Sequence, residues 1–151
     1  MNDDIQYHIK EYYSFWSKIN NLYGKWAKEH DLSYHSLFVL YAIWDSKDNI
    51  CTQKKICDDW LFPKQTVNSI LKKFEEKNYI LLQSLSKDKR HKEILLTDEG
   101  RHYADKIFVE LYNLEEKVMQ HMGEINRNNM TKNNTLFLNL FKEAMDEKSN
   151  L

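Results

Sequence analysis

Apolar residues recur at helical spacing over most of this chain, and the spacing becomes that of strands in one short segment. Large apolar side chains from Ile5 to Trp26 share one stripe, which predicts a first helix from about Asp4 to Glu29. At about 1.5 Å per residue this helix would be roughly 39 Å long, more than a small domain covers with its own core. We therefore expect part of its aromatic stripe to contact another chain, the chain's own last helix, or both.

Three shorter helices are predicted next. Ser33 and Thr52 are expected to cap the second and third helices, and Pro63 suits the first turn of the fourth. The inward faces expected for these helices are Leu37, Leu40, Tyr41 and Trp44; Ile56, Trp60 and Leu61; and Val67, Ile70, Leu71 and Phe74. Two short helices joined by a tight turn, the second with a polar outer face, form a helix-turn-helix.

A hairpin is predicted after the fourth helix. Asn78 tolerates the left-handed conformation that ends helices, and strands are expected from Tyr79 to Gln83 and from Glu93 to Leu96. The residues between them, Ser86 to Lys92, are too charged to pack and should form the tip. Helix, strand, charged tip and strand together describe a winged helix.

Long helices are also predicted at the end of the chain. Thr97 is the expected cap of a fifth helix that reaches Met122, and a last helix should begin at Met130-Thr131. The predicted fold is mainly α, a winged helix-turn-helix with a small two- or three-stranded antiparallel wing. Residues 32–97 would form this winged helix-turn-helix, and residues 1–31 and 98–151 the long helices that flank it.

Charge is unevenly distributed along the chain. The 151 residues carry a net charge of −1, yet residues 64–92 hold eight Lys or Arg against three Asp or Glu. This excess concentrates positive potential on one surface, as phosphate attraction requires. On the fourth helix, Gln65, Asn68 and Ser69 point away from the apolar face; amides can pair with adenine, and lysine with guanine or phosphate. An ordinary solvent-exposed helix face has the same polar character, so this face by itself does not distinguish DNA binding from simple exposure to solvent.

Several motifs in order resemble the MarR family of bacterial transcription regulators. Leu32-Ser33, Thr52-Gln53, Thr66-Val67-Asn68, Phe74 to Ile80 and Leu96 to Gly100 lie where that family places them, and Asp88-Lys89-Arg90 is similar to its Asp-x-Arg wing motif. Asn78 replaces the glycine usual after the fourth helix, and Ser36 stands where many relatives have glutamine. The resemblance implies a homodimer, a repressor in our interpretation, that binds a pseudo-palindromic double-stranded DNA operator. Residues 32–97 would then be the DNA-binding domain, and residues 1–31 and 98–151 the dimerisation helices.

Two sets of site residues follow from the side-chain chemistry and this resemblance. The residues expected to contact DNA are Thr52, Lys64, Gln65, Thr66, Asn68, Ser69, Lys72, Lys73, Lys87, Asp88, Lys89, Arg90 and His91. The resemblance also implies a small aromatic or anionic effector between the dimerisation helices and the winged helix. An aromatic cleft for it would be lined by Tyr13, Trp16, His35, Tyr41 and Trp44, although a plain core role for these residues is the stronger alternative.

Other functions fit the sequence less well. The six histidines are scattered and no glycine-rich phosphate loop is present, so we expect neither an enzyme nor a cofactor or metal site. A redox- or metal-responsive regulator of the same fold is an alternative, but Cys57 lies among apolar residues, as a buried hydrophobe would. A helical partner module that does not bind DNA would leave the basic segment without a use. Two cysteines and no apolar span predict a cytoplasmic protein without membrane contact.

Overall fold

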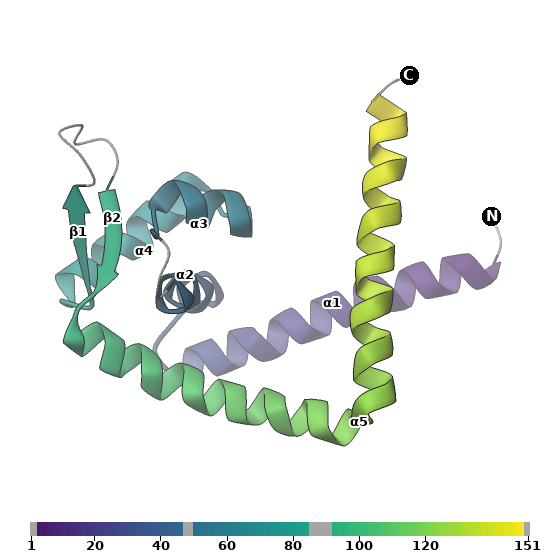
Figure 1. Cartoon of the computed structure of the whole chain (residues 1–151), viewed down its shortest axis with the longest axis horizontal. Coiled ribbons are helices and arrows are strands. Elements are labelled where there is room, and N and C mark those ends of the chain that lie inside the picture. Colours follow the sequence, from purple (N-terminus) through teal and green to yellow (C-terminus); the bar gives the residue numbers. More distant parts are fainter. Residues whose placement is uncertain (1–2, 47–49, 85–91, 150–151) are drawn as a thin grey trace. The chain divides into compact units, whose positions relative to one another are not determined.

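In the computed structural model, the chain forms five helices and one two-stranded sheet within the residues that the structure describes, 3–46, 50–84 and 92–149. Figure 1 shows them in the order α1 (Asp3–Glu29), α2 (Tyr34–Asp45), α3 (Gln53–Trp60), α4 (Lys64–Glu76), β1 (Ile80–Ser84), β2 (Lys92–Leu96) and α5 (Asp98–Ser149). The predicted winged helix-turn-helix is confirmed. The chain divides into two compact units, Met1–Phe108 and Val109–Leu151.

The predicted helix caps are present. The Ser33 hydroxyl accepts a hydrogen bond from the N–H of Ser36, and the Thr52 hydroxyl accepts one from the N–H of Lys55, both at 3.1 Å. Each such cap stabilises its helix by about 1 kcal/mol. The caps therefore fix where α2 and α3 begin.

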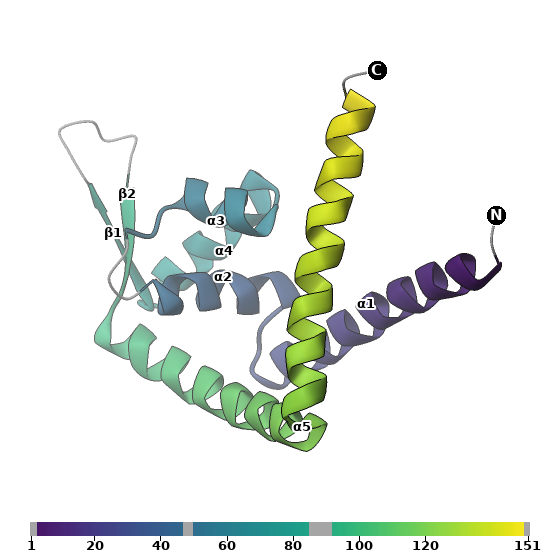
Figure 2. The same cartoon turned by 45° about the vertical axis from the view of Figure 1, so that its right-hand side comes forward.

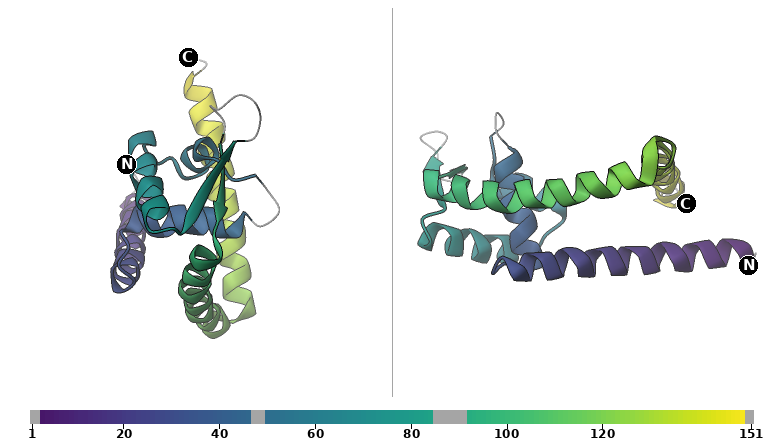
Figure 3. Two further views of the ribbon diagram at one scale, coloured as in Figure 1. Left: turned by 90° about the vertical axis from the view of Figure 1, so that its left-hand side faces the viewer. Right: turned by 90° about the horizontal axis from the view of Figure 1, so that it is seen from below.

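Helix α2 is central to the first unit, because α1, α4 and β2 all pack against it (Figure 3). Its Leu37, Val39 and Leu40 are fully buried, together with side chains from every neighbouring element. These partners include Ala27, Ile56, Val67, Ile80, Ile107 and Phe108. The resulting apolar core contacts only one face of α4.

Strands β1 and β2 form an antiparallel hairpin that pairs Ile80 with Leu96 and ends at the pair of Ser84 and Lys92 (Figure 2). Ile80 and Ile94 are buried on one face, whereas Leu81 and Leu95 are exposed on the other. A half-buried antiparallel ribbon has this alternation. The hairpin is thus anchored to the core and projects away from it.

One predicted core position is wrong. Leu61 was expected to face inward, but its side chain is 87% exposed and its backbone is left-handed, with φ of 52°. Helix α3 ends at Trp60, so Leu61 belongs to the turn and no longer follows the helical spacing on which the expectation rested.

The predicted start of the last helix is also wrong. The chain is already helical directly after Gly123, whose own φ of 75° and ψ of 161° are not helical. Figure 2 shows that α5 changes direction within its length. Glycine adopts such angles without the penalty that a Cβ brings. One glycine therefore separates the two helical segments, with no loop up to Met130. Among the described residues, none of the helices combines the length and hydropathy needed to cross a bilayer.

Candidate nucleic-acid interface

Helix α4 has two chemically distinct faces. Val67, Ile70, Leu71 and Phe74 are buried, as predicted. The polar side chains on the other face are exposed: Lys64, Gln65, Asn68, Ser69, Lys72 and Lys73. Thr66 is half-buried at the edge between the two faces. Because the apolar face is fixed in the core, the exposed amides and lysines are held at one register along a rigid helix.

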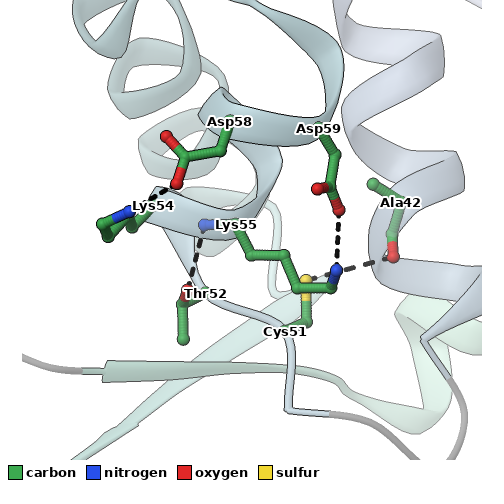
Figure 4. Close-up of polar contacts among 7 residues, drawn as sticks. All are labelled: Ala42, Cys51, Thr52, Lys54, Lys55, Asp58 and Asp59. Atoms are coloured by element: carbon green, nitrogen blue, oxygen red, sulfur yellow. Dashed lines mark hydrogen bonds and ion pairs between the residues drawn. The ribbon is translucent and has the colours of Figure 1, made fainter.

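The start of α4 is tied to the start of α3. The side-chain amide of Gln53 donates a hydrogen bond to the carbonyl oxygen of Lys64, 3.1 Å away. Figure 4 shows the neighbouring surface of α3, where Lys54 pairs with Asp58 and Lys55 pairs with Asp59. These pairs are exposed and add little stability, but they offset the charge of both lysines. The positive charge of this region consequently comes from Lys64, Lys72 and Lys73 of α4 and from Lys92 at the start of β2.

Two grooves flank α4. The hairpin-side groove lies between the start of α3, α4 and the strands, and it is lined by Thr52, Gln53, Lys54, Asn68, Leu71, Lys72, Glu75, Leu82, Lys92 and Ile94. The α2-side groove lies at the start of α2 and is lined by Ser33, His35, Ser36, Pro63, Gln65, Thr66, Ser69, Ile70 and Lys73. Each groove contains lysine and hydroxyl groups, and neither α2 nor α3 has an acidic residue in its first turn. Helix starts of this kind favour anions.

The two grooves have a polarity that suits a helix lying in a DNA major groove. A helix that reads base edges has one phosphate backbone on each side of it. The grooves beside α4 place lysine ammonium and hydroxyl donors at those two flanks. The residues of these grooves that were not among the predicted contacts include Ser33, Ser36, Gln53 and Lys92, although their places at helix caps, beside them or at the strand end were a usable signal.

The end of α4 is locked by backbone and side-chain bonds. Asn78 adopts φ of 58°, as predicted, and the N–H of Tyr79 donates to the carbonyl of Phe74 at 2.8 Å. The Thr97 hydroxyl donates to the carbonyl of Asn78 at 2.6 Å and accepts from the N–H of Gly100 at 2.9 Å. The last turn of α4 is thus bonded to the first turn of α5.

The predicted wing contacts lie outside the described residues. Lys87, Asp88, Lys89, Arg90 and His91 follow the last described residue of β1, Ser84, and precede Lys92. Their contact with DNA stays a prediction.

The predicted effector residues fall into different surroundings. Trp44 is buried and its indole N–H donates to the Asp105 carboxylate at 2.6 Å, while the ring of Tyr41 packs against Phe108. Tyr13 and Trp16 are exposed on α1. His35 packs against Phe62, next to the start of α4. A role for these five residues in effector binding stays a prediction.

Neither cysteine has the properties of an activated thiolate. Burial raises the pKa of Cys51 to about 11, and the same cause raises the pKa of the half-buried Cys57. The Cys51 thiol lies 3.9 Å from the carbonyl oxygen of Ala42 (Figure 4). Reactive cysteines need the opposite shift. In the part of the chain that is described, no three His, Cys, Asp or Glu side chains are grouped as metal ligands.

Comparison with known proteins gives a consistent result. The profile of the family described as Transcriptional regulator SarA/Rot matches residues 21–107. The HTH-type transcriptional regulator SarZ of Staphylococcus aureus is 33% identical over 119 residues, covering 74% of this chain and 78% of SarZ. A MarR family regulator from Neisseria meningitidis superposes with a TM-score of 0.74 at 25% identity, covering 98% of this chain and 99% of that one. The fold also matches that of MepR from S. aureus in a DNA complex, with a TM-score of 0.72, 18% identity and coverage of 87% and 96%.

Proposed function

Because this chain belongs to the family of SarA/Rot transcriptional regulators, we propose that it regulates transcription as a homodimer that binds a pseudo-palindromic operator. One observation carries the proposal: the exposed face of α4 presents amides and lysines on a helix whose other face is fixed in the core. The fold match to MepR, whose structure was solved with DNA, supports the same interpretation. Repression of the bound promoter is part of the proposal.

We assign the contacts of α4 by side-chain chemistry. Gln65, Asn68 and Ser69 would reach base edges in the major groove, because amides and hydroxyls there distinguish base pairs. Lys64, Lys72 and Lys73 would contact phosphate, since a lysine ammonium is a point charge that suits the backbone. Thr52 and Thr66 lie beside them, and the residues from Lys87 to His91 would enter the flanking minor groove.

The apolar side chains of the terminal helices support the dimer. In α1, Ile5, Ile9 and Trp16 are 43% to 53% exposed. In the second unit, the exposed residues of the last helical segment include Leu136, Phe137, Leu140, Phe141 and Met145. Large apolar side chains in such numbers are rarely left exposed to water. An obligate dimer interface of about 2,000 Å² or more would cover them. Light scattering at micromolar concentration should give the mass of a dimer; a stable monomer would refute this part.

A regulator of this kind acts on the chromosome, so we place the protein in the cytoplasm. The test of its function is selection of binding sites from random duplex DNA by the full-length protein. An inverted repeat is expected, with half-site centres about 10 base pairs or a multiple of that apart. If repeated rounds enrich no sequence, the proposed function is wrong.

A further inference from the structure

Tyr79 is the third residue beyond α4, and both its backbone N–H and its backbone carbonyl are hydrogen-bonded. Its N–H bonds to Phe74 in the last turn of α4, and its carbonyl accepts from the N–H of Thr97 at 3.1 Å. Its ring stacks on the ring of Tyr103, with centroids 4.4 Å apart and planes inclined by 15°. The segment that ends α4 is therefore in direct contact with Tyr103 through the ring of Tyr79.

Tyr103 is held in turn by α1. It lies on the first turns of α5, and its hydroxyl donates to the carbonyl oxygen of His30 at 3.0 Å. His30 follows the last residue of α1, where Asp31 with φ of 57° and a bond from the N–H of Leu32 to the carbonyl of Ala27 close the helix end. One side chain of α5 thus touches the end of α1 and the end of α4 together.

The hydroxyl and the ring of Tyr103 have separate roles. A tyrosine hydroxyl is protonated at neutral pH and can donate this bond, and burial raises the pKa of Tyr103 further, to about 12. The ring carries the contact to Tyr79, and the hydroxyl alone carries the bond to α1. Removing the oxygen leaves the stack in place and deletes only the link to His30.

We propose that Tyr103 is a positioning residue, whose link to His30 sets the orientation of α4 relative to α1 together with the packing of both helices on α2. In a dimer built on α1, that orientation sets the separation of the two α4 helices and so the half-site spacing that the protein accepts. The inference rests on the proposed function. A purely structural tyrosine would contribute stability and leave the spacing preference unchanged.

The test compares Tyr103→Phe with wild type on the selected operator and on duplexes whose half-sites are moved by one base pair. Each shift rotates and displaces a half-site, and should cost wild type about tenfold in affinity. For Tyr103→Phe, the ratio between the affinities for the selected and the shifted operators should fall to about threefold or less. Its affinity for random duplex should be unchanged. The control is Tyr34→Phe, which deletes a hydroxyl bond between α2 and Asn20 of α1, 3.2 Å long, and should keep the wild-type preference.

A second readout needs no DNA. Spin labels on Lys73→Cys in a Cys57→Ser background report the distance between the two α4 helices, since Cys51 is buried. Tyr103→Phe should broaden this distance distribution, whereas Tyr34→Phe should not. A wild-type spacing preference or a wild-type distance distribution in Tyr103→Phe would overturn the inference. Equal loss of affinity for all duplexes would overturn it as well, and failure of wild type to enrich DNA would refute the proposed function instead.

Discussion

Gly100 lies directly against the backbone of Tyr79: a Cβ placed on Gly100 would come within 1.8 Å of the Tyr79 carbonyl oxygen. That carbonyl also accepts the bond from Thr97, so it cannot move without breaking the junction between α4 and α5. Gly100→Ala should therefore destabilise the fold by about 3 kcal/mol or more in urea unfolding. Gly24→Ala is the matched control, because nothing lies within 4 Å of its Cβ position and helix propensity predicts a gain of about 1 kcal/mol. Equal stability of the two variants would contradict the packing described.

Asn78 both ends α4 and bonds to α5. Its left-handed backbone costs alanine about 1–2 kcal/mol, and its side-chain amide donates to the Glu99 carboxylate at 3.3 Å. Asn78→Ala should thus lose both contributions, whereas Asn78→Gly loses only the bond and should stay within about 1 kcal/mol of wild type. Thermal and urea unfolding of the two variants would show the order; an alanine variant as stable as the glycine one would be inconsistent with it.

Alkaline pH should weaken the protein through Cys51. Its pKa is raised by burial to about 11 from an ordinary value of 9.0. Below pH 9 both the folded and the unfolded thiol are protonated and stability is unaffected. Between pH 9 and 11 only the unfolded thiol ionises, so stability falls, by about 1 kcal/mol at pH 10. Cys51→Ala should lose less stability than wild type between pH 8 and pH 10, whatever its stability at pH 8. A parallel pH dependence would argue against a protonated, buried thiol.

The wing motif can be tested by a substitution that removes a negative charge. The Asp88 carboxylate can accept two parallel hydrogen bonds from the Arg90 guanidinium. Such a pair would restrict the orientation of the arginine side chain before it enters a minor groove. Asp88→Ala should then weaken operator binding although it makes the wing more basic. Binding at one fixed salt concentration would decide, with Lys89→Ala as the comparison. Unchanged or tighter binding of Asp88→Ala, with Arg90→Ala no worse than Lys89→Ala, would mean that the acid is incidental.

Local rules in the sequence predicted most of this fold. Caps at Ser33 and Thr52, the buried face of α4 and the left-handed Asn78 each depend on neighbours a few residues away. Leu61 and the start of the last helix were missed because a single turn residue and a single glycine changed the helical phase. The bonds from Trp44 to Asp105 and from Tyr103 to His30 join residues 61 and 73 positions apart, and periodicity carries no signal for such pairs.

The central claim, that the exposed face of α4 reads DNA, is tested most directly by two alanine variants on two duplexes. The measurement is the dissociation constant of the selected operator and of a scrambled duplex, followed over a range of salt concentrations. Asn68→Ala should weaken binding by about 1–3 kcal/mol on the operator alone, whereas Lys72→Ala should weaken both duplexes and reduce the salt slope by about one for each phosphate that the lysine neutralises. If Asn68→Ala keeps the wild-type ratio of operator to scrambled affinity, and Lys72→Ala keeps its salt slope, α4 is not the reading element.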